Sequence, residues 1–251
     1  MNHMFAIPSY QRFDVLKNKT LQYLQASNVD MNKVYVFCVE EEYEQYRELP
    51  CHVVIGKKGL KEQRNFIINF FPENTKLICM DDDIEYIDGL ECPLLDWIEQ
   101  VFKAMEDKKA YLAGVYPCFN PFFRKNAKKD ITEDLRFIIG CFYFTINRKE
   151  MIENDNFNNK DDYSRTIRHF IKDKIVLRYN KIGVKTKFYG KGGLGNFKDR
   201  IEPSRIECEL FKQKYPCRIK VRKNGMSEIV FIPTILTNYE SPPIILTKST
   251  I

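Results

Sequence analysis

Three adjacent aspartates, Asp81, Asp82 and Asp83, follow directly after the apolar run Leu77–Met80. Four consecutive apolar residues are typical of a strand buried on both faces, and ligands bind outside the carboxyl ends of strands in open α/β sheets. Adjacent carboxylates repel one another unless a cation balances them, and a hard divalent metal is the usual partner. Because side chains alternate along an extended segment, Asp81 and Asp83 would share one side. A solvated acidic turn is the alternative that this stretch alone leaves open.

A second acidic group, Asp161 and Asp162, lies at the predicted start of a helix that reaches Ile171. Free backbone N–H groups and the helix dipole stabilise carboxylates in a first turn, so helix capping explains the pair without any chemistry. The functional alternative is that one of the two is a general base, kept ionised by this environment. His169 in the same helix is predicted to be structural.

The segments before Asp81 alternate between strand and helix patterns. Strands are predicted at 4–8, 33–39, 52–55 and 76–80, and helices at 13–26, 40–47 and 60–71. This alternation implies a parallel sheet with helices on its faces and right-handed crossovers.

Lys61 and Arg64 share one face of the helix predicted at 60–71, just before the acidic strand. Both cations are therefore expected near the rim of the same cleft, where a diphosphate could use them. A solvated helix face is the alternative for this pair.

The second half of the chain is less regular. The predicted elements are a helix at 93–107, a strand at 110–116, an aromatic loop at 117–123, a long strand at 135–146 with a bulge or a close approach at Gly140, a strand at 175–179, a helix at 200–215 and a hairpin at 218–232. The aromatic loop either folds onto the core or stacks on a base or sugar beside the cleft.

Basic residues are concentrated in the second half, although the net charge of +6 is modest. A glycine-rich loop at 184–196 carries Lys185, Lys187 and Lys191 and could close over phosphates. The first hairpin strand places Arg218, Lys220 and Arg222 on one face, with Lys223 next to them. An acidic centre beside a basic half suits an enzyme for phosphorylated molecules or a nucleic-acid acceptor, and a merely solvated surface remains the alternative.

Length and composition exclude several classes of protein. With 251 residues and 44% hydrophobic content, the chain can bury a real core and is not disordered. We expect neither a membrane span, since no apolar run approaches the necessary length, nor a secretory leader. The eight cysteines never form Cys-x-x-Cys, so we expect buried free thiols. Free thiols are typical of a reducing compartment, and we therefore expect the protein in the cytoplasm, which would be the host cytoplasm if the chain is viral.

Four motifs together resemble nucleotide-sugar glycosyltransferases of the GT-A fold over roughly the first 190 residues. They are Ile7-Pro-Ser-Tyr-Gln-Arg12, Lys61-Glu-Gln-Arg-Asn65, Asp81-Asp-Asp83 and Asp161-Asp162. A narrower resemblance is to the phage TET-associated glycosyltransferases, which add sugars to hydroxymethylated pyrimidines in DNA. It rests on Asp161-Asp162-Tyr163, the loop from Val184 to Gly193, and Phe211-Lys-Gln-Lys-Tyr-Pro216.

The resemblance implies a fold and a division of the chain. The fold would be α/β and GT-A-like (Rossmann-type), with a mixed, mostly parallel sheet flanked by helices. Residues 1–190 would form the nucleotide-sugar-binding and catalytic domain, and 191–251 a smaller C-terminal segment of basic loop, helix and hairpin packed on it.

The resemblance also implies roles for individual residues. Asp81 and Asp83 would hold Mn²⁺ or Mg²⁺ on the diphosphate of a UDP-sugar, with UDP-glucose as the expected donor, and Asp162, or else Asp161, would be the general base. The donor-binding residues would be Pro8, Ser9, Tyr10, Arg12, Lys61, Arg64, Asp82, Lys187 and Lys191. The DNA-binding residues would be Lys185, Arg218, Lys220, Arg222 and Lys223. Many family members take a further metal ligand, often a histidine, from the later part of the chain, but no histidine follows His169 here.

The expected partners are therefore a nucleotide sugar and double-stranded DNA with modified bases. Three alternatives stay open: transfer to a glycan, lipid or protein, a metal-dependent nucleotidyltransferase, and a non-enzymatic nucleic-acid-binding module whose acidic cluster is only a surface turn.

Overall fold

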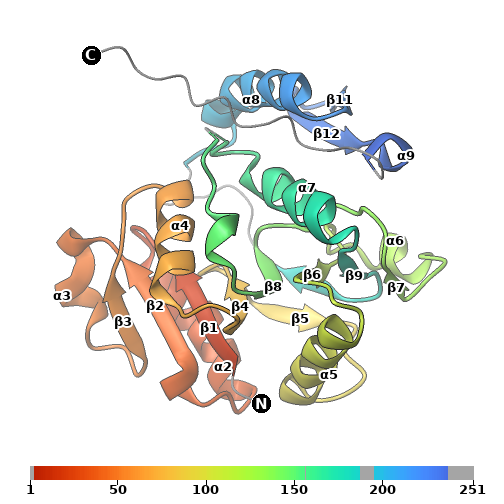
Figure 1. The fold of residues 1–251 in the computed structure, drawn as a ribbon. Coiled ribbons are helices and arrows are strands. Elements are labelled where there is room, and N and C mark those ends of the chain that lie inside the picture. Colours follow the sequence, from red (N-terminus) through yellow and green to blue (C-terminus); the bar gives the residue numbers. More distant parts are fainter. Residues whose placement is uncertain (1–2, 156, 187–194, 237–251) are drawn as a thin grey trace.

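The computed structural model describes residues 3–155, 157–186 and 195–236. An eight-stranded sheet in the order β3-β2-β1-β4-β8-β6-β9-β7 is flanked by helices (Figure 1). Its strands are β1 (His3–Pro8), β2 (Val34–Cys38), β3 (His52–Ile55), β4 (Lys76–Met80), β6 (Leu112–Val115), β7 (Ile131–Thr132), β8 (Phe142–Ile146) and β9 (Leu177–Tyr179). Two smaller antiparallel ladders pair β5 (Tyr86–Asp88) with β10 (Gly183–Lys185), and β11 (Cys217–Val221) with β12 (Ser227–Phe231).

Nine α-helical segments lie in the described part of the chain. They are α1 (Phe13–Leu16), α2 (Gln22–Ala26), α3 (Tyr43–Tyr46), α4 (Leu60–Phe70), α5 (Leu94–Asp107), α6 (Pro121–Lys125), α7 (Asp161–Asp173), α8 (Ile201–Lys214) and α9 (Pro233–Leu236). A π-helical turn, Lys17–Leu21, joins α1 to α2, so the helix predicted at 13–26 is continuous.

Strand direction follows the predicted alternation. Strands β3, β2, β1 and β4 pair in parallel, and β8 enters antiparallel between β4 and β6. The expectation of a mixed, mostly parallel sheet is therefore confirmed. All four apolar residues of β4 are buried, with Ile78 and Met80 in one core cluster and Leu77 and Cys79 in the other. The run Leu77–Met80 is thus a strand covered on both faces.

The two core clusters lie on opposite faces of the sheet. The helical segment 13–26 and α5 contribute to one cluster, which contains Trp97 and Phe102. Helices α4 and α7 contribute to the other, through Ile67 and Ile167. The same cluster continues outward into α8 and the β11–β12 hairpin, which lie beyond α7 in Figure 1. The site elements α4, β4 and α7 are therefore packed together.

The long strand predicted at 135–146 is wrong in its first half, because only Phe142–Ile146 belongs to the sheet. The preceding residues turn toward α7 instead. Ile138 N donates to Thr166 Oγ1 at 3.2 Å, and Gly140 N donates to Asp162 Oδ2 at 3.3 Å. Backbone N–H groups that would have joined a ladder are satisfied by side chains of a helix distant in the sequence.

The aromatic loop predicted at 117–123 is partly helical, since Asn120 caps α6 by accepting a hydrogen bond from Phe122 N. Phe122 and Phe123 are 66% and 51% exposed, so these two rings are not folded onto the core.

All eight cysteines are free, and five of them are buried. This confirms that no disulfide framework holds the fold. Within the described residues, no helix combines the length and the apolar character that a membrane crossing requires.

Candidate active site

A pocket of about 380 Å³ lies beside the acidic cluster that follows β4. Its wall comes from the loops after β1, β2 and β3, from the first turns of α4 and from the segment after β10. Ligand pockets in open α/β sheets occupy this position. The lining residues are Pro8, Ser9, Tyr10, Arg12, Val39, Lys57, Lys58, Gly59, Leu60, Gln63, Arg64, Asp81, Asp82, Asp83, Thr186 and Arg200.

Asp82 and Asp83 are buried and held by neighbouring side chains. Arg12 Nη1 lies 3.1 Å from Asp82 Oδ1 and 3.1 Å from Asp83 Oδ2. Ser9 Oγ donates to Asp82 Oδ2 at 2.8 Å, and Thr186 Oγ1 donates to Asp83 Oδ1. One arginine and two hydroxyl groups therefore fix both carboxylates.

Asp81 differs from its two neighbours, because its side chain is 38% exposed and its ion-pair contact with Arg64 spans 3.9 Å. Removal from bulk water, followed by repulsion from Asp83 and Asp82, raises the pKa of Asp81 to about 7, although Arg64 opposes the shift. Burial likewise raises the pKa of Asp82 to about 6, against the effect of Arg12. The three carboxylates share two guanidinium groups, those of Arg12 and Arg64, and Arg64 also pairs with Asp161.

Asp81 and Asp83 both line the pocket, and their carboxylates are the candidate ligands for a divalent cation. Among the residues that the structure describes, no group of three or more His, Cys, Asp or Glu side chains is arranged to hold a metal. Mg²⁺ is commonly bound through one or two carboxylates plus water and substrate phosphates, so two protein ligands are sufficient.

Arg64 connects the acidic cluster to the start of α7. Its guanidinium forms an ion pair with Asp161, donates to Gly140 O at 3.2 Å, and faces Asp81. A side chain at Gly140 would meet Arg64 at 3.0 Å and Asp162 at 3.3 Å, so the glycine allows this close approach. The expected close approach at Gly140 is thus present, although it involves protein side chains.

The two carboxylates at the start of α7 have different surroundings. Asp161 is buried between Arg64 and Arg165, whose Nη1 lies 3.4 Å from Asp161 Oδ2. Within the part of the chain that the structure describes, the donors to Asp162 are backbone groups, Gly140 N at 3.3 Å and Tyr163 N at 3.0 Å. Asp161 is therefore engaged in charge pairing, whereas Asp162 is the carboxylate without a cationic partner in these contacts.

The C-terminal helix and hairpin anchor the segment that precedes α7. Lys160 Nζ donates to Ser227 O at 2.7 Å, and Asn159 N donates to Glu207 Oε2 at 2.7 Å. Arg200, which lines the pocket, donates from Nε to Asn159 Oδ1 at 3.0 Å. Residues after 195 thus position the pocket wall and the carboxylates of α7.

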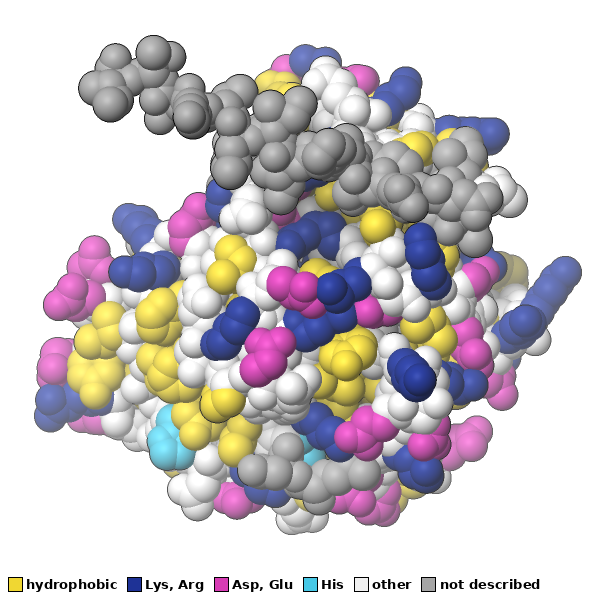
Figure 2. Space-filling model, viewed as in Figure 1, with side chains coloured by type: hydrophobic (Ala, Val, Ile, Leu, Met, Phe, Trp, Pro, Cys, Tyr) yellow, Lys and Arg dark blue, Asp and Glu magenta, His cyan; other side chains and the backbone are white. Residues whose placement is uncertain are grey.

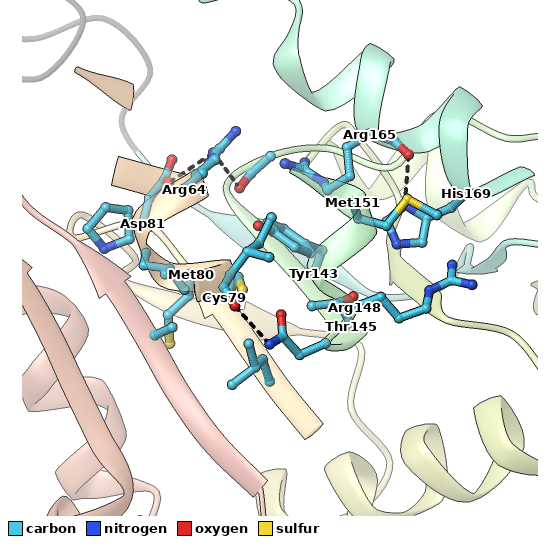
Figure 3. Close-up of a pocket in the computed structure, with 17 residues that line it drawn as sticks. Arg64, Cys79, Met80, Asp81, Tyr143, Thr145, Arg148, Met151, Arg165 and His169 are labelled. Atoms are coloured by element: carbon cyan, nitrogen blue, oxygen red, sulfur yellow. Dashed lines mark hydrogen bonds and ion pairs between the residues drawn. The ribbon is translucent and has the colours of Figure 1, made fainter. Parts of the chain in front are cut away.

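A smaller cavity of about 40 Å³ lies between α4, β4, β8 and α7 (Figure 3). Arg165 lies over the ring of Tyr143, with its guanidinium carbon 3.8 Å from the ring centroid (Figure 3). Buried polar atoms of Arg165, Arg148 and Asn147 have no protein partner, and the cavity is large enough for a water molecule to serve them. Arg165, which pairs with Asp161, is therefore one wall of this cavity.

His169 lines this cavity and is structural, as predicted. Its Nδ1 donates to Arg165 O at 2.9 Å. Burial, with the positive charges of Arg148, Arg165 and Arg168, lowers the pKa of His169 to about 3. The native protein therefore holds this imidazole neutral.

We expect His169 to make the protein less stable as the pH falls. Unfolded histidine titrates near pH 6.5, so below that pH the unfolded chain binds a proton that the folded chain excludes. Between pH 6 and pH 4 the free energy of unfolding should therefore fall more steeply in the wild-type protein than in His169→Gln. The two slopes should differ by up to about 1.4 kcal/mol per pH unit. Urea titrations across this range measure the free energy of unfolding of both proteins. Asp81 and Asp82 contribute in the opposite direction, but they are present in both proteins, so their contributions cancel in the difference. Parallel curves would contradict the prediction.

The structure does not bring every predicted residue to the pocket. Lys61 belongs to α4 but does not line the pocket, and its Nζ lies 3.7 Å from Glu62 Oε1. Lys187 and Lys191 lie outside the described residues. Lys185 directly precedes the pocket residue Thr186 but does not itself line the pocket. The hairpin residues Arg218, Lys220, Arg222 and Lys223 are exposed and away from the pocket wall, and Arg222 forms an ion pair with Glu228.

The charged or hydroxyl-bearing pocket residues that the sequence reasoning missed are Lys57, Lys58, Thr186 and Arg200. Lys57 and Lys58 stand between two glycines directly after the strand predicted at 52–55, so the sequence offered a signal for them. Lys58 Nζ lies 5.5 Å from the centroid of the Tyr10 ring. Nothing local in the sequence distinguishes Thr186 or Arg200.

Comparison with solved structures places this site in a known fold, although no protein-family profile and no curated protein sequence matches the chain. The mannosyltransferase PcManGT from Pyrobaculum calidifontis, in complex with GDP-Man and Mn²⁺, is 12% identical with a TM-score of 0.54, over 84% of this chain and 63% of the mannosyltransferase. S. aureus TarS in complex with UDP-GlcNAc is 13% identical with a TM-score of 0.53, over 83% of this chain and 66% of the TarS chain. A mycobacterial protein is 9% identical with a TM-score of 0.55, over 91% and 83% of the two chains.

These likenesses confirm the predicted fold class, a GT-A-like α/β fold. The chain spans less than two thirds of the length of the mannosyltransferase.

Proposed function

We propose that this chain is a metal-dependent glycosyltransferase that moves a sugar from a UDP-sugar, with UDP-glucose as the expected donor, to a hydroxymethylated pyrimidine in DNA. One observation carries the proposal: Arg64 joins three pocket-lining carboxylates to a helix start that presents a second acidic pair. The GT-A-like fold supports it, because two of the similar structures hold nucleotide sugars.

The donor would bind in the large pocket. Asp81 and Asp83 would hold Mn²⁺ or Mg²⁺, which supplies charge stabilisation for the departing diphosphate. Lys57, Lys58 and Arg200 line the same pocket and can neutralise phosphate oxygens, and the ring of Tyr10 can pack on the nucleoside. Pro8, Ser9, Arg12, Arg64 and Asp82 keep their proposed place in donor binding. For Lys61, Lys187 and Lys191 the same role rests on the sequence alone.

Asp162 would act as the general base. It takes the proton from the acceptor hydroxyl while that oxygen forms a bond to the anomeric carbon, and the bond from this carbon to the diphosphate breaks, so that UDP leaves. Two backbone N–H groups keep Asp162 in place. Asp161 would be a positioning residue, because its ion pairs with Arg64 and Arg165 compete with proton uptake.

The DNA acceptor is the finer part of the proposal. It rests on the resemblance described above and on exposed basic side chains of the hairpin, Arg218, Lys220 and Lys223. Arg222 of the same hairpin is paired with Glu228, and Lys185 is half-buried. Exposed basic side chains hold phosphates, so binding should weaken steeply with salt. We also propose that residues 191–251 belong to the catalytic unit, and that the enzyme acts in the cytoplasm, where eight free cysteines persist.

The test is a screen of nucleotide sugars with Mn²⁺ against hydroxymethylated and unmodified DNA, with the product read by mass spectrometry. We expect addition of one hexose to the hydroxymethylated DNA, release of UDP, and loss of both on chelation with EDTA. Transfer only to a saccharide, lipid or protein would reject the DNA acceptor. Release of pyrophosphate would identify a nucleotidyltransferase instead.

A further inference from the structure

Three exposed aromatic side chains lie on two segments, β5 and α6, that Arg124 joins through its ion pair with Asp88. Phe122, Phe123 and Tyr86 are 66%, 51% and 43% exposed, and Phe122 is the most exposed large hydrophobic residue that the structure describes. Exposed lysines at 125, 128 and 129 belong to the same segment. We use the name α6 surface for Tyr86, Phe122, Phe123, Lys125, Lys128 and Lys129.

The backbone of the α6 surface is firmly attached despite its exposed rings. The buried guanidinium of Arg124 donates to Lys181 O at 2.7 Å and to Phe119 O at 3.1 Å, and it forms an ion pair with Asp88. These contacts fix α6 against the β5–β10 ladder. Rings held on a fixed backbone lose little entropy when they meet a ligand. The exposure of Phe122 and Phe123 is therefore a property of an ordered element.

The α6 surface begins at the rim of the acidic cluster. Tyr86 opens β5, directly after that cluster, and its ring packs edge-on against Phe119 with centroids 5.5 Å apart. Lys185 Nζ lies 5.2 Å from the centroid of Phe119, and the next residue, Thr186, binds Asp83. A polymer lying across this surface would therefore pass beside the pocket.

The charge of the α6 surface indicates what it binds. Its three lysines are exposed. Asp130 is the one acidic residue of the segment 121–130, and its Oδ1 lies 3.9 Å from Lys181 Nζ. Lysine and arginine side chains project at the edge of the molecule where the α6–β7 loop lies (Figure 2). A ligand that satisfies both rings and lysines is a polyanion with flat, accessible rings. A nucleic acid with unpaired bases has this chemistry.

We infer that the α6 surface docks the acceptor nucleic acid, with Phe122, Phe123 and Tyr86 stacking on unpaired bases next to the target and the lysines holding phosphates. The inference rests on the proposed function and sharpens it. It requires the strand to be locally open, because a paired base cannot stack on a side chain and reach the pocket.

The test compares Phe122→Ala/Phe123→Ala with Ile206→Ala/Leu210→Ala, a control that removes two side chains of α8 that are 46% and 44% exposed. Fluorescence anisotropy measures binding to a single-stranded oligonucleotide, to its fully paired duplex, and to a duplex with one unpaired hydroxymethylpyrimidine. We expect the first variant to lose at least about tenfold in affinity for the single strand and for the open duplex, since one stacked base contributes about that factor. The control should bind like the wild-type protein, and unfolding midpoints confirm that both variants are folded.

Equal affinity of the wild-type protein and Phe122→Ala/Phe123→Ala for single strands would overturn the inference. So would a loss seen only with phosphatidylserine vesicles, which would identify the surface as a membrane contact. If the variant loses oligonucleotide affinity while the wild-type protein transfers sugar to no DNA, docking stands and the proposed acceptor fails. If both proteins modify DNA with the same KM, the proposed function stands and the docking surface fails.

Discussion

Asp81→Asn and Asp83→Asn are each expected to lower sugar transfer by about 100-fold or more, because they remove a carboxylate from the proposed cation site. A metal ion contributes several kcal/mol to stabilising a departing diphosphate, and each 1.4 kcal/mol corresponds to a factor of ten in rate. Hydrolysis of the UDP-sugar without acceptor should fall in parallel, since the loss affects the leaving group. Titrations of Mn²⁺ in a coupled UDP-release assay measure both rates.

Glu85→Gln is the matched control for this pair. This variant removes one negative charge from the same segment. The side chain of Glu85 is 38% exposed, as is that of Asp81, and it pairs with Lys19 outside the pocket wall. The control should retain activity within about twofold, because surface charges of this kind have small effects. If Asp81→Asn and Asp83→Asn also retained activity and Mn²⁺ dependence, the cluster would be a surface turn and the metal site would be rejected.

The strand that carries this cluster was predictable because its signal is local. Four consecutive apolar residues are typical of a strand with cover on both faces, and Leu77 to Met80 alternate between the two core clusters. The β-α alternation before it predicted the parallel direction of β1, β2, β3 and β4, although not their order in the sheet. The prediction of a strand over 135–146 was wrong in its first half because backbone N–H groups there donate to the side chains of Thr166 and Asp162. No local pattern in the sequence reveals hydrogen-bond partners that distant.

In the candidate site, too, the features with a local sequence signal were predictable, and those that depend on distant contacts were not. The residues of the first strand loop and of the acidic motif line one pocket, as expected from elements whose ends meet at one edge of the sheet. Arg12 binds Asp82 and Asp83 across some 70 positions of sequence, a contact that no local pattern predicts, and its contact with the nucleotide stays a prediction. Arg200 reaches the pocket because α8 packs beyond α7, which depends on tertiary contacts rather than on any motif.

The start of α7 leads to a second strong prediction, on Asp162→Asn. This variant should lower the rate of transfer by about 100-fold to 10,000-fold, the usual contribution of a positioned general base. Binding of UDP should be unchanged, because Asp162 does not line the donor pocket. Stability should change by less than about 1 kcal/mol, since the side chain accepts only two backbone hydrogen bonds in a first helical turn.

Asp161→Asn separates the roles of the two neighbours. Its carboxylate pairs with Arg64 and Arg165, so loss of its charge removes a shared partner from two largely shielded guanidinium groups and should destabilise the fold by about 3 kcal/mol. Thermal unfolding would then distinguish the variants: Asp161→Asn melts early, and Asp162→Asn melts near the wild-type midpoint but is nearly inactive. Full transfer by Asp162→Asn would remove this residue as the base. Because Asp161 is already paired with two arginines, a retaining mechanism would then become the better explanation of the site.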